Sequence, residues 1–233
     1  MKLMSFNTQH CLNYLEQKVD YEIMARAIEE CGADIVGLNE MFDEAEGAKF
    51  GAQTARLSEL TSLKNHFFAK AIDDFEGPYG NGLLTKYKIE SAESIIIPDP
   101  CPREYPGGFY ETRCLLKARL ENGLTVIVTH FGLNPDEQEN AVKTIVENMA
   151  PRKCIVMGDF NMEPDNPILN PIMQGLQDTA KFFSTYKLSF PSDTPKVKID
   201  YIFVSKDLKV EYADIPEIIS SDHRPHVATI ELE

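Results

Sequence analysis

The sequence predicts an α/β fold in which mixed β-sheets and helices form layers. Two observations indicate this class. Nine short runs of strand length are rich in apolar residues, and many of them are apolar without alternation, which is typical of strands covered on both faces. Longer stretches with apolar residues at helical spacing alternate with these runs along the chain.

Length and composition predict a single domain over residues 1–233. A chain of 233 residues with 43% hydrophobic residues can bury roughly 70 to 75% of its unfolded surface, which is enough for one sizeable core. The longest linker-like stretch, residues 98–108, is too short to separate two domains. We therefore expect a surface loop there.

The predicted strands are spread over most of the chain. They lie at residues 2–7, 34–40, 80–86, 93–97, 112–120, 124–131, 153–160, 198–205 and 226–232. The elements follow in the order strand, helix, strand, helix, a block of hairpin-like strands that turns at Asn122 and Gly123, then helix, strand, helix and closing strands. This mixture predicts sheets that combine parallel and antiparallel strands.

Two helices carry clear start signals. Residues 21–31 have apolar residues three and four positions apart, after Asp20 as the N-cap. Residues 136–149 follow Asn134, which can cap, and Pro135, which fits the first helical position. Acidic residues in the first turn of the second helix suit the positive end of its dipole. Both helices are predicted to pack against a sheet.

The charge balance limits the partners. The formal net charge is −14, from 37 acidic and 23 basic residues, and no Lys/Arg-rich run has interleaved aromatic residues. Tight binding to long nucleic acid requires many cations that neutralise phosphates. We therefore expect no strong binding to duplex DNA.

The distribution of apolar residues along the chain predicts the compartment of the protein. No apolar stretch approaches the roughly 18 residues of a membrane span, and the first fifteen residues hold polar residues in place of an apolar signal core. We expect no transmembrane segment and a cytoplasmic protein. The five cysteines lie far apart without a Cys-x-x-Cys pair, so they are predicted to be small buried residues and not disulfides or zinc ligands.

Polar residues gather at the ends of the strand-like runs. The most informative motif is Gly-Asp-Phe-Asn at residues 158–161, which ends an apolar run in a carboxylate and a carboxamide. The other polar residues are placed similarly, either ending a run or directly preceding the last one: Asn7, Glu40, His130, Asp222 and His223. Each residue alone is equally typical of a turn, a cap or a core position. If the strands share a sheet system, one rim gathers them all.

Such a rim brings together four carboxylates: Glu40, Asp159, Asp200 and Asp222. Two like charges about 5 Å apart repel by roughly 3 kcal/mol at an effective dielectric constant of about 20. The cluster therefore calls for a cation or for raised carboxyl pKa values. Oxygen donors without clustered Cys or paired His favour Mg²⁺ or Mn²⁺ over Zn²⁺.

The remaining polar residues suit proton transfer and phosphate binding. His223 can take a proton at neutral pH, and a carboxylate such as Asp200 on its other ring nitrogen would orient it. Asn161 and His130 can donate hydrogen bonds to a phosphoryl group without adding negative charge.

Together the motifs resemble those of the endonuclease/exonuclease/phosphatase superfamily, which includes deoxyribonuclease I, exonuclease III, inositol polyphosphate 5-phosphatases and neutral sphingomyelinases. They occur in family order: SFN at 5–7, NE at 39–40, THF at 129–131, GDFN at 158–161, IDYIF at 199–203 and SDHRP at 221–225. The resemblance covers nearly the whole chain. It implies a four-layer α/β sandwich of two mixed β-sheets packed face to face, with helices on the outer faces.

The resemblance also implies roles for the site residues. Three residues would hold the metal: Glu40 as principal ligand, with Asn7 and Asp222. Asp159 would activate the attacking water or protonate the leaving group. His223, paired with Asp200, would act as base or stabilise the transition state, and the motif leaves open which residue is the general base. Asn161 and His130 would contact the substrate phosphate.

The chain departs from the family pattern in two places. Asn39 stands before Glu40 where the family commonly has Gln, and Asn81 or Gly82 stands where an aliphatic residue is usual. We expect the first change to be tolerated and the second place to be structural. Arg113 in Glu-Thr-Arg resembles a family strand, and it either faces the pocket as a substrate-binding residue or is an exposed strand arginine. His66 and His226 are expected to be ordinary loop or strand histidines, and so is His10, for which a position over the pocket, in the loop after Asn7, is the alternative.

The sequence therefore predicts a Mg²⁺-dependent hydrolase of phosphate esters, monomeric or weakly associating, which acts on a small-molecule or lipid-derived phosphodiester or phosphomonoester. Mn²⁺ is an alternative metal. A Mg²⁺-dependent DNA or RNA nuclease is the alternative enzyme, and a catalytically silent binding module is the alternative from another class. Specificity in such a fold depends on loops, so the natural substrate is not predicted.

Overall fold

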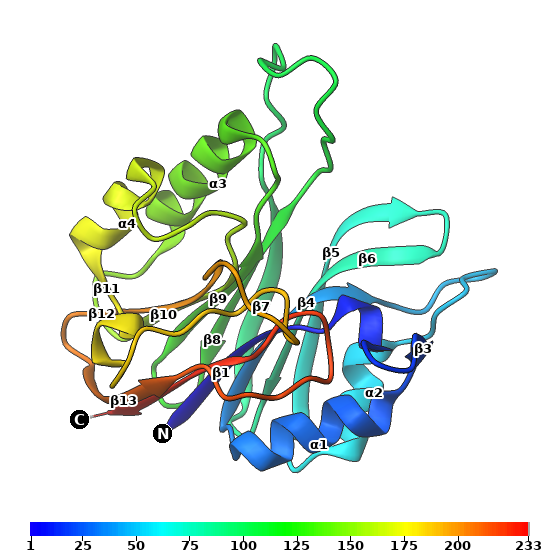
Figure 1. Ribbon diagram of the computed structural model, residues 1–233, viewed down its shortest axis with the longest axis horizontal. Coiled ribbons are helices and arrows are strands. Elements are labelled where there is room, and N and C mark those ends of the chain that lie inside the picture. The colour runs from blue at the N-terminus through cyan, green and yellow to red at the C-terminus, as the bar shows by residue number, and fades with distance from the viewer. Residues whose placement is uncertain (233) are drawn as a thin grey trace.

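Two six-stranded sheets face one another, with helices on their outer sides, in the computed structural model, which describes residues 1–232 (Figure 1). The first sheet has the strand order β13-β14-β1-β4-β6-β5, and the second has the order β11-β12-β10-β9-β8-β7. Both sheets mix parallel and antiparallel pairs. The predicted four-layer α/β sandwich is confirmed.

The strands of the first sheet are β1 (Lys2–Asn7), β4 (Ile35–Phe42), β5 (Asn65–Asp74), β6 (Gly77–Thr85), β13 (Lys209–Asp214) and β14 (His226–Glu231). Those of the second sheet are β7 (Ile89–Ile96), β8 (Cys114–Leu120), β9 (Thr125–His130), β10 (Cys154–Asp159), β11 (Leu176–Asp178) and β12 (Asp200–Ser205). A small hairpin joins β2 (Leu12–Asn13) and β3 (Lys18–Val19). The α-helices are α1 (Tyr21–Cys31), α2 (Gln53–Leu60), α3 (Pro135–Asn148) and α4 (Asn170–Gly175). Short 3-10 turns occupy Gln9–Cys11, Pro167–Leu169 and Thr179–Phe182.

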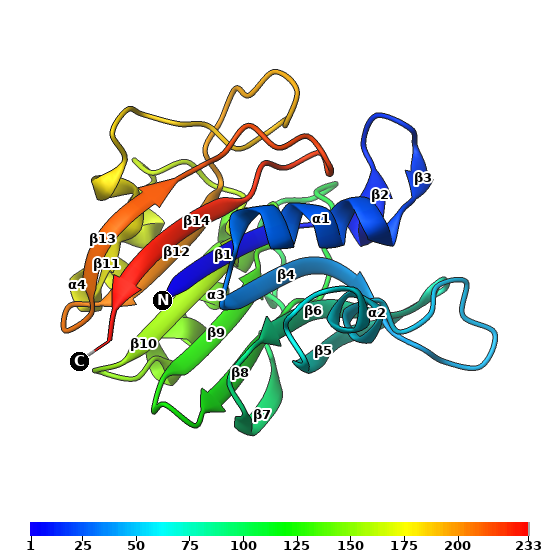
Figure 2. The same ribbon diagram turned by 90° about the horizontal axis from the view of Figure 1, so that it is seen from below.

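The continuous apolar runs form the sandwich because each strand places alternate residues on opposite faces. The inner core lies between the sheets and includes Leu3, Ile35, Val128 and Met157. The neighbours of these residues along the strands face outward against helices. α1 and α2 cover the outer face of the first sheet, and α3 and α4 cover that of the second (Figures 1 and 2).

Both predicted helix starts are present. The Asp20 side chain accepts a hydrogen bond from the Ile23 amide at 3.1 Å and caps α1. Pro135 opens α3, and the amide of its N-cap Asn134 donates to Glu137 Oε2 at 3.2 Å. These caps satisfy amide groups that a helix start otherwise leaves without partners.

Two strands of the first sheet were not identified from the sequence. β5 and β13 are its two edge strands, and most of their residues are exposed or partly exposed. Their polar residues interrupt the apolar pattern, because an edge strand does not need cover on both faces. Among the predicted strands, β7 begins earlier than expected, at Ile89, and β8 begins later, at Cys114.

The strand directions place the predicted site residues at one rim. β1 and β4 run parallel, with Asn7 beside Asn39 at their carboxyl ends. β9 and β10 also run parallel and end together at His130 and Asp159. Since β12 runs antiparallel to β10, its first residue, Asp200, lies directly opposite Asp159.

All five cysteines are free, and four of them are buried. Within residues 1–232, no helix combines the length and apolar character that a membrane crossing requires.

His226, the first residue of β14, is a buried histidine outside the rim. Its Nε2 lies 3.0 Å from Thr179 Oγ1, and its Nδ1 lies 3.2 Å from the Asp200 carbonyl oxygen. Burial, together with the nearby Lys198 ammonium, lowers the pKa of His226 to about 3. The ring is therefore neutral in the folded protein at ordinary pH.

We expect His226 to make folding stability depend on pH. Its pKa is about 6.5 in the unfolded chain, so between about pH 6.5 and the folded value the unfolded state binds a proton that the folded state does not. Stability is therefore lost as pH falls. Urea unfolding of wild type should show, from about pH 7 to about pH 5, a loss larger by about 2 kcal/mol than that of His226→Gln. Parallel pH profiles of the two proteins would contradict the assignment.

Candidate active site

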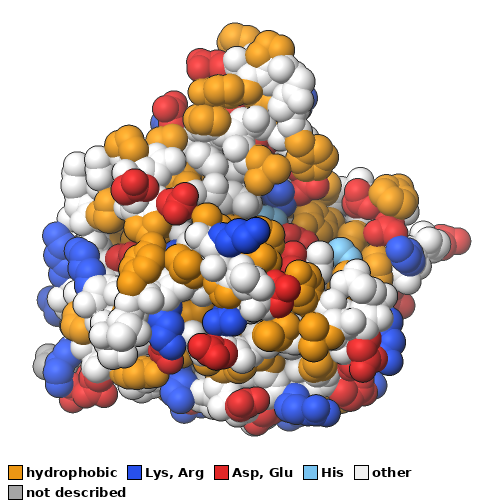
Figure 3. All heavy atoms as spheres, in the orientation of Figure 1, with side chains coloured by type: hydrophobic (Ala, Val, Ile, Leu, Met, Phe, Trp, Pro, Cys, Tyr) orange, Lys and Arg blue, Asp and Glu red, His pale blue; other side chains and the backbone are white. Residues whose placement is uncertain are grey.

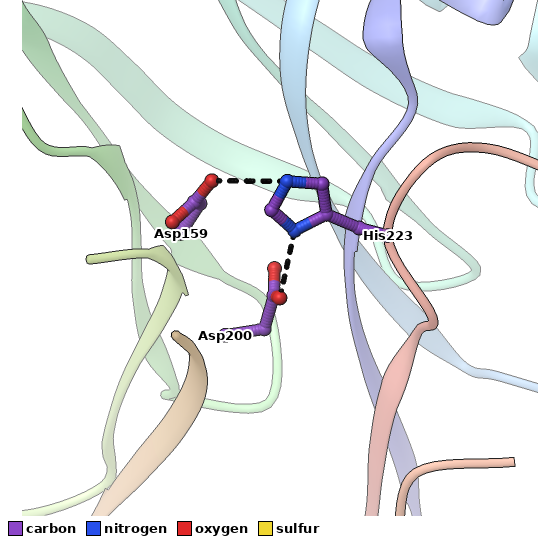
Figure 4. Close-up of side chains that lie close together, drawn as sticks. All are labelled: Asp159, Asp200 and His223. Carbon is purple, nitrogen blue, oxygen red and sulfur yellow. Dashed lines mark hydrogen bonds and ion pairs between the residues drawn. The ribbon is translucent and has the colours of Figure 1, made fainter. Parts of the chain in front are cut away.

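The centre of the site is a histidine between two buried aspartates, each from a different segment (Figure 4). His223 Nδ1 donates to Asp200 Oδ2 at 2.8 Å, and its Nε2 lies 3.6 Å from Asp159 Oδ2. Burial alone lowers the pKa of His223, but the carboxylates of Asp200 and Asp159 outweigh it and raise the pKa to about 10. The imidazole is thus a cation that both aspartates hold in place.

Asp159 is a buried carboxylate of the rim and is 1% exposed. Burial raises its pKa to about 7, against the opposing effect of His223. Its Oδ1 accepts from the Asn161 amide at 2.9 Å, and its Oδ2 accepts from Asn7 Nδ2 at 3.1 Å. Gly158 is required before it, because a Cβ there would lie 1.8 Å from the Thr129 carbonyl oxygen. An acid with this pKa can give or take a proton near neutral pH.

Asn7, Glu40 and Asp222 form the more open side of the site. Asn7 Nδ2 also donates to Glu40 Oε1 at 3.0 Å, so this amide joins the Glu40 carboxylate, two residues before the end of β4, to the Asp159 carboxylate at the end of β10. Glu40 has a left-handed backbone, with φ of 58°, and its side chain is 23% exposed. Burial raises the pKa of Asp222, and the negative charges of Glu40 and Asp200 raise it further.

This open side fits a hard divalent cation. Its oxygen donors are the carboxylates of Glu40 and Asp222 and the Asn7 amide oxygen, which here accepts from the Gln9 amide at 3.1 Å, and these are ligand types that Mg²⁺ and Mn²⁺ prefer. Burial is the main cause of the raised pKa of Asp222, and the charge of Glu40 adds to it against the opposing effect of His223. Asp159, Asp200 and His223 also place ligand atoms within 4.8 Å of one another. That trio fits a metal less well, because its protonated histidine already donates to one aspartate.

A second cluster lies beside Asp159 and contains the predicted phosphate contacts. His130 Nε2 lies 3.7 Å from Asp159 Oδ2 and 3.2 Å from Asn161 Nδ2. Arg113 NH1 lies 3.1 Å from His130 Nδ1 and pairs with Glu111 Oε1 at 2.6 Å. Burial, with the charges of Arg113 and His223, lowers the pKa of His130 well below its ordinary value. The ring is neutral, and because the Arg113 guanidinium can only donate, Nδ1 accepts and we assign the proton to Nε2.

The structure therefore brings all nine predicted site residues to one rim: Asn7, Glu40, Arg113, His130, Asp159, Asn161, Asp200, Asp222 and His223. Of the two readings of Arg113, the pocket position is the observed one, since the side chain is 10% exposed and contacts His130. His66 is exposed on β5, and His226 is a core residue.

Of the two positions considered for His10, an ordinary loop position and one over the pocket, the structure has the second, beside Glu40. Its Nδ1 lies 3.9 Å from Glu40 Oε2, and its ring packs against Phe42 and Phe50 with centroids 6.0 and 5.6 Å away. Its backbone is left-handed, with φ of 47°. The available signal was its place three residues after Asn7, at the end of β1.

The site opens into a hollow on one face of the molecule. Figure 3 shows histidine side chains inside this hollow, with acidic and basic side chains next to them. The loop that contains residues 98–113 protrudes on one side, and the β5–β6 hairpin extends on another (Figure 1). The rim therefore lies between these two segments.

Comparisons with known proteins agree with this geometry. The sequence profile described as the Endonuclease/Exonuclease/phosphatase family matches residues 4–223. An endonuclease/exonuclease/phosphatase from Beutenbergia cavernae DSM 12333 has a similar structure, with 22% identity, a TM-score of 0.76, and coverage of 100% of this chain and 71% of that one. The mannosyl-6-phosphatase of Bacteroides thetaiotaomicron VPI-5482 has 15% identity, a TM-score of 0.76 and 100% coverage of both chains. The human nocturnin catalytic domain with bound sulfate has 19% identity, a TM-score of 0.72, and coverage of 99% of this chain and 94% of that one. A search of curated proteins gave no significant match.

We expect Mg²⁺ to stabilise the protein through Glu40. Mg²⁺ at about 100 times its dissociation constant should add about 2.7 kcal/mol to the free energy of unfolding, because only the folded rim gathers the ligands. Thermal melting with and without Mg²⁺ measures this. Glu40→Gln should lose the shift, whereas Glu59→Gln, at an exposed residue of α2, should keep it. An undiminished shift in Glu40→Gln would contradict the assignment.

Proposed function

Because the chain belongs to the Endonuclease/Exonuclease/phosphatase family, we propose that it is a Mg²⁺-dependent hydrolase of phosphate esters. One observation carries the proposal. A histidine, His223, lies between two buried aspartates at a rim that also holds Asn7 and Glu40. This arrangement combines proton transfer groups with oxygen donors for a cation, which are the two requirements of metal-assisted ester cleavage.

Glu40, Asn7 and Asp222 would hold the metal, and Mn²⁺ would be an acceptable substitute. When bound, a hard divalent ion neutralises charge on the phosphoryl oxygens and acidifies or orients water. Asn7 has an additional task in the protein itself. Its amide donates to both Glu40 and Asp159, and it thereby separates two carboxylates that would otherwise repel each other.

Asp159 and His223 would move the protons. Asp159, with a pKa of about 7, would take a proton from the attacking water or give one to the leaving group. His223 is held as a cation by Asp200 and would stabilise the negative charge that develops on the phosphoryl group. A comparison of the kinetics of Asp159 and His223 variants would decide which of the two is the general base.

Asn161, His130 and Arg113 would bind the phosphate. Asn161 Nδ2 donates to the Phe131 carbonyl at 3.0 Å and lies near His130, so both side chains are already oriented before substrate enters. Arg113 contributes a guanidinium beside the neutral His130 ring. Donors that are fixed in advance stabilise a developing oxyanion without reorganisation.

We propose a small-molecule or lipid-derived phosphate ester as the substrate class. The net charge of −14 disfavours a polyanion, and Glu111 already neutralises part of the charge of Arg113. A phosphatase with a similar fold acts on mannosyl 6-phosphate by its name, which supports a sugar phosphate as one member of this class. A cytoplasmic location and a monomeric or weakly associating state complete the proposal.

Hydrolysis of bis(p-nitrophenyl) phosphate and p-nitrophenyl phosphate tests the reaction, with Mg²⁺, Mn²⁺ or EDTA present. We expect turnover that EDTA abolishes and that falls at least about 100-fold in Glu40→Ala and His223→Ala, since a general acid or base contributes about 10²- to 10⁴-fold. His66→Ala, at an exposed histidine, is the matched control and should keep wild-type rates. Turnover that persists in Glu40→Ala or in EDTA would refute the metal-dependent mechanism.

A Mg²⁺-dependent nuclease is the second candidate, because the family includes endonucleases and exonucleases by name. Purified protein is incubated with supercoiled plasmid and Mg²⁺ over a range of salt concentrations. We expect little nicking at physiological salt. Robust nicking that His223→Ala abolishes would replace the small-molecule substrate with nucleic acid.

A further inference from the structure

Two buried asparagines cross the otherwise apolar space between the sheets. Asn39 on β4 is 0% exposed and Asn81 on β6 is 2% exposed. Their surroundings are inner-core residues such as Leu83, Val128 and Met157. A buried amide destabilises a core unless its hydrogen bonds are satisfied, so the partners of these two side chains show what they do.

The partners of Asn39 lie next to the proposed catalytic residues. Its Nδ2 donates to Asn81 Oδ1 at 2.8 Å and to the Thr129 carbonyl at 2.7 Å, directly before His130. Its Oδ1 accepts from the amide of Asp159 at 3.0 Å. Both amide protons and the oxygen are therefore used, and two of the three bonds reach the second sheet.

Asn81 completes the network from the neighbouring strand. Its oxygen accepts from Asn39, and its Nδ2 donates to the Cys114 carbonyl on β8 at 3.0 Å. The pair therefore joins β4 and β6 of the first sheet to β8, β9 and β10 of the second. Three of these strands carry proposed site residues: Glu40 lies on β4, His130 on β9 and Asp159 on β10.

Asn81 also lies opposite an irregularity in β4. The pairing of β4 with β6 joins Leu38 to Gly82 and Met41 to Gly80, so Asn39 and Glu40 together face the single residue Asn81. This is a β-bulge, which inserts one extra residue and redirects a side chain. Glu40 is one of the two residues of the bulge, and its φ of 58° lies in the left-handed region. A non-glycine residue keeps that backbone only where its surroundings hold it.

We infer that Asn39 and Asn81 are a pair of positioning residues that hold this bulge, so that Glu40 points into the metal site at a fixed distance from Asp159. The inference rests on the proposed function for the role of Glu40. It is distinct from a contribution to stability alone, because the bonded groups are the backbone beside His130 and the amide of Asp159 itself.

A double-mutant cycle tests the pair. Asn39→Ala, Asn81→Ala and the double variant are compared with wild type for Mg²⁺ affinity by calorimetry and for hydrogen exchange of the Asp159 amide by NMR. Ile230→Val is the control, because Ile230 is a core residue near the opposite end of the first sheet and should lose stability without loss of Mg²⁺ affinity.

We expect each single variant to weaken Mg²⁺ binding at least tenfold and to speed exchange of the Asp159 amide. The double variant should be no weaker than the weaker single variant within about threefold, since residues of one network are not additive. Wild-type affinity and wild-type exchange in Asn81→Ala would overturn the inference, as would effects that multiply. If wild type itself binds no Mg²⁺, the proposed function fails, and the exchange of the Asp159 amide alone then decides whether the pair holds the site backbone.

Discussion

Burial of the Asp159 carboxylate between the two sheets is the constraint on which the site depends. A charged group withdrawn from water must be paired and hydrogen-bonded, or it becomes neutral. The fold answers from both sides of the sandwich. Asn7 donates from the first sheet, the Asn161 amide donates from the turn after β10, and His223 approaches from the segment before β14. The approach of the two sheets at this rim is therefore what brings the partners of the buried carboxylate together.

Two features of the site lower the stability of the folded protein. Glu40 has a left-handed backbone, and the neighbouring Asp222 has a raised pKa partly because of the charge of Glu40. A protein selected for stability alone would avoid both features. Their presence at the most open part of the rim, next to an amide that can offer oxygen, is what a cation site requires. The strain and the repulsion thus identify where a ligand would stabilise the protein.

The sequence predicted the layers and the site because their signals are local. Continuous apolar runs identify strands covered on both faces, and each catalytic candidate ends or precedes such a run, as Asp159 does. The edge strands β5 and β13 were not identified, because exposure on one side removes the apolar signal. The link between Asn39 and Asn81 was also beyond reach. Two residues 42 positions apart were noted as separate departures from a family pattern, and only the register of β4 and β6 shows that they are partners.

The residues that surround the proposed catalytic groups would select the substrate and would not carry out the reaction. Arg113 contacts Glu111 and His130, so under the proposed function its positive charge would serve one phosphoryl group and not a broad surface. On another side, His10 packs with Phe42 and Phe50 beside Glu40, which gives the rim an aromatic wall. A polyanion would gain from many dispersed cations, whereas one phosphate with a sugar or apolar remainder gains from one guanidinium and an aromatic surface. The proposed catalytic residues would therefore serve many phosphate esters, and the residues around them would select among these esters.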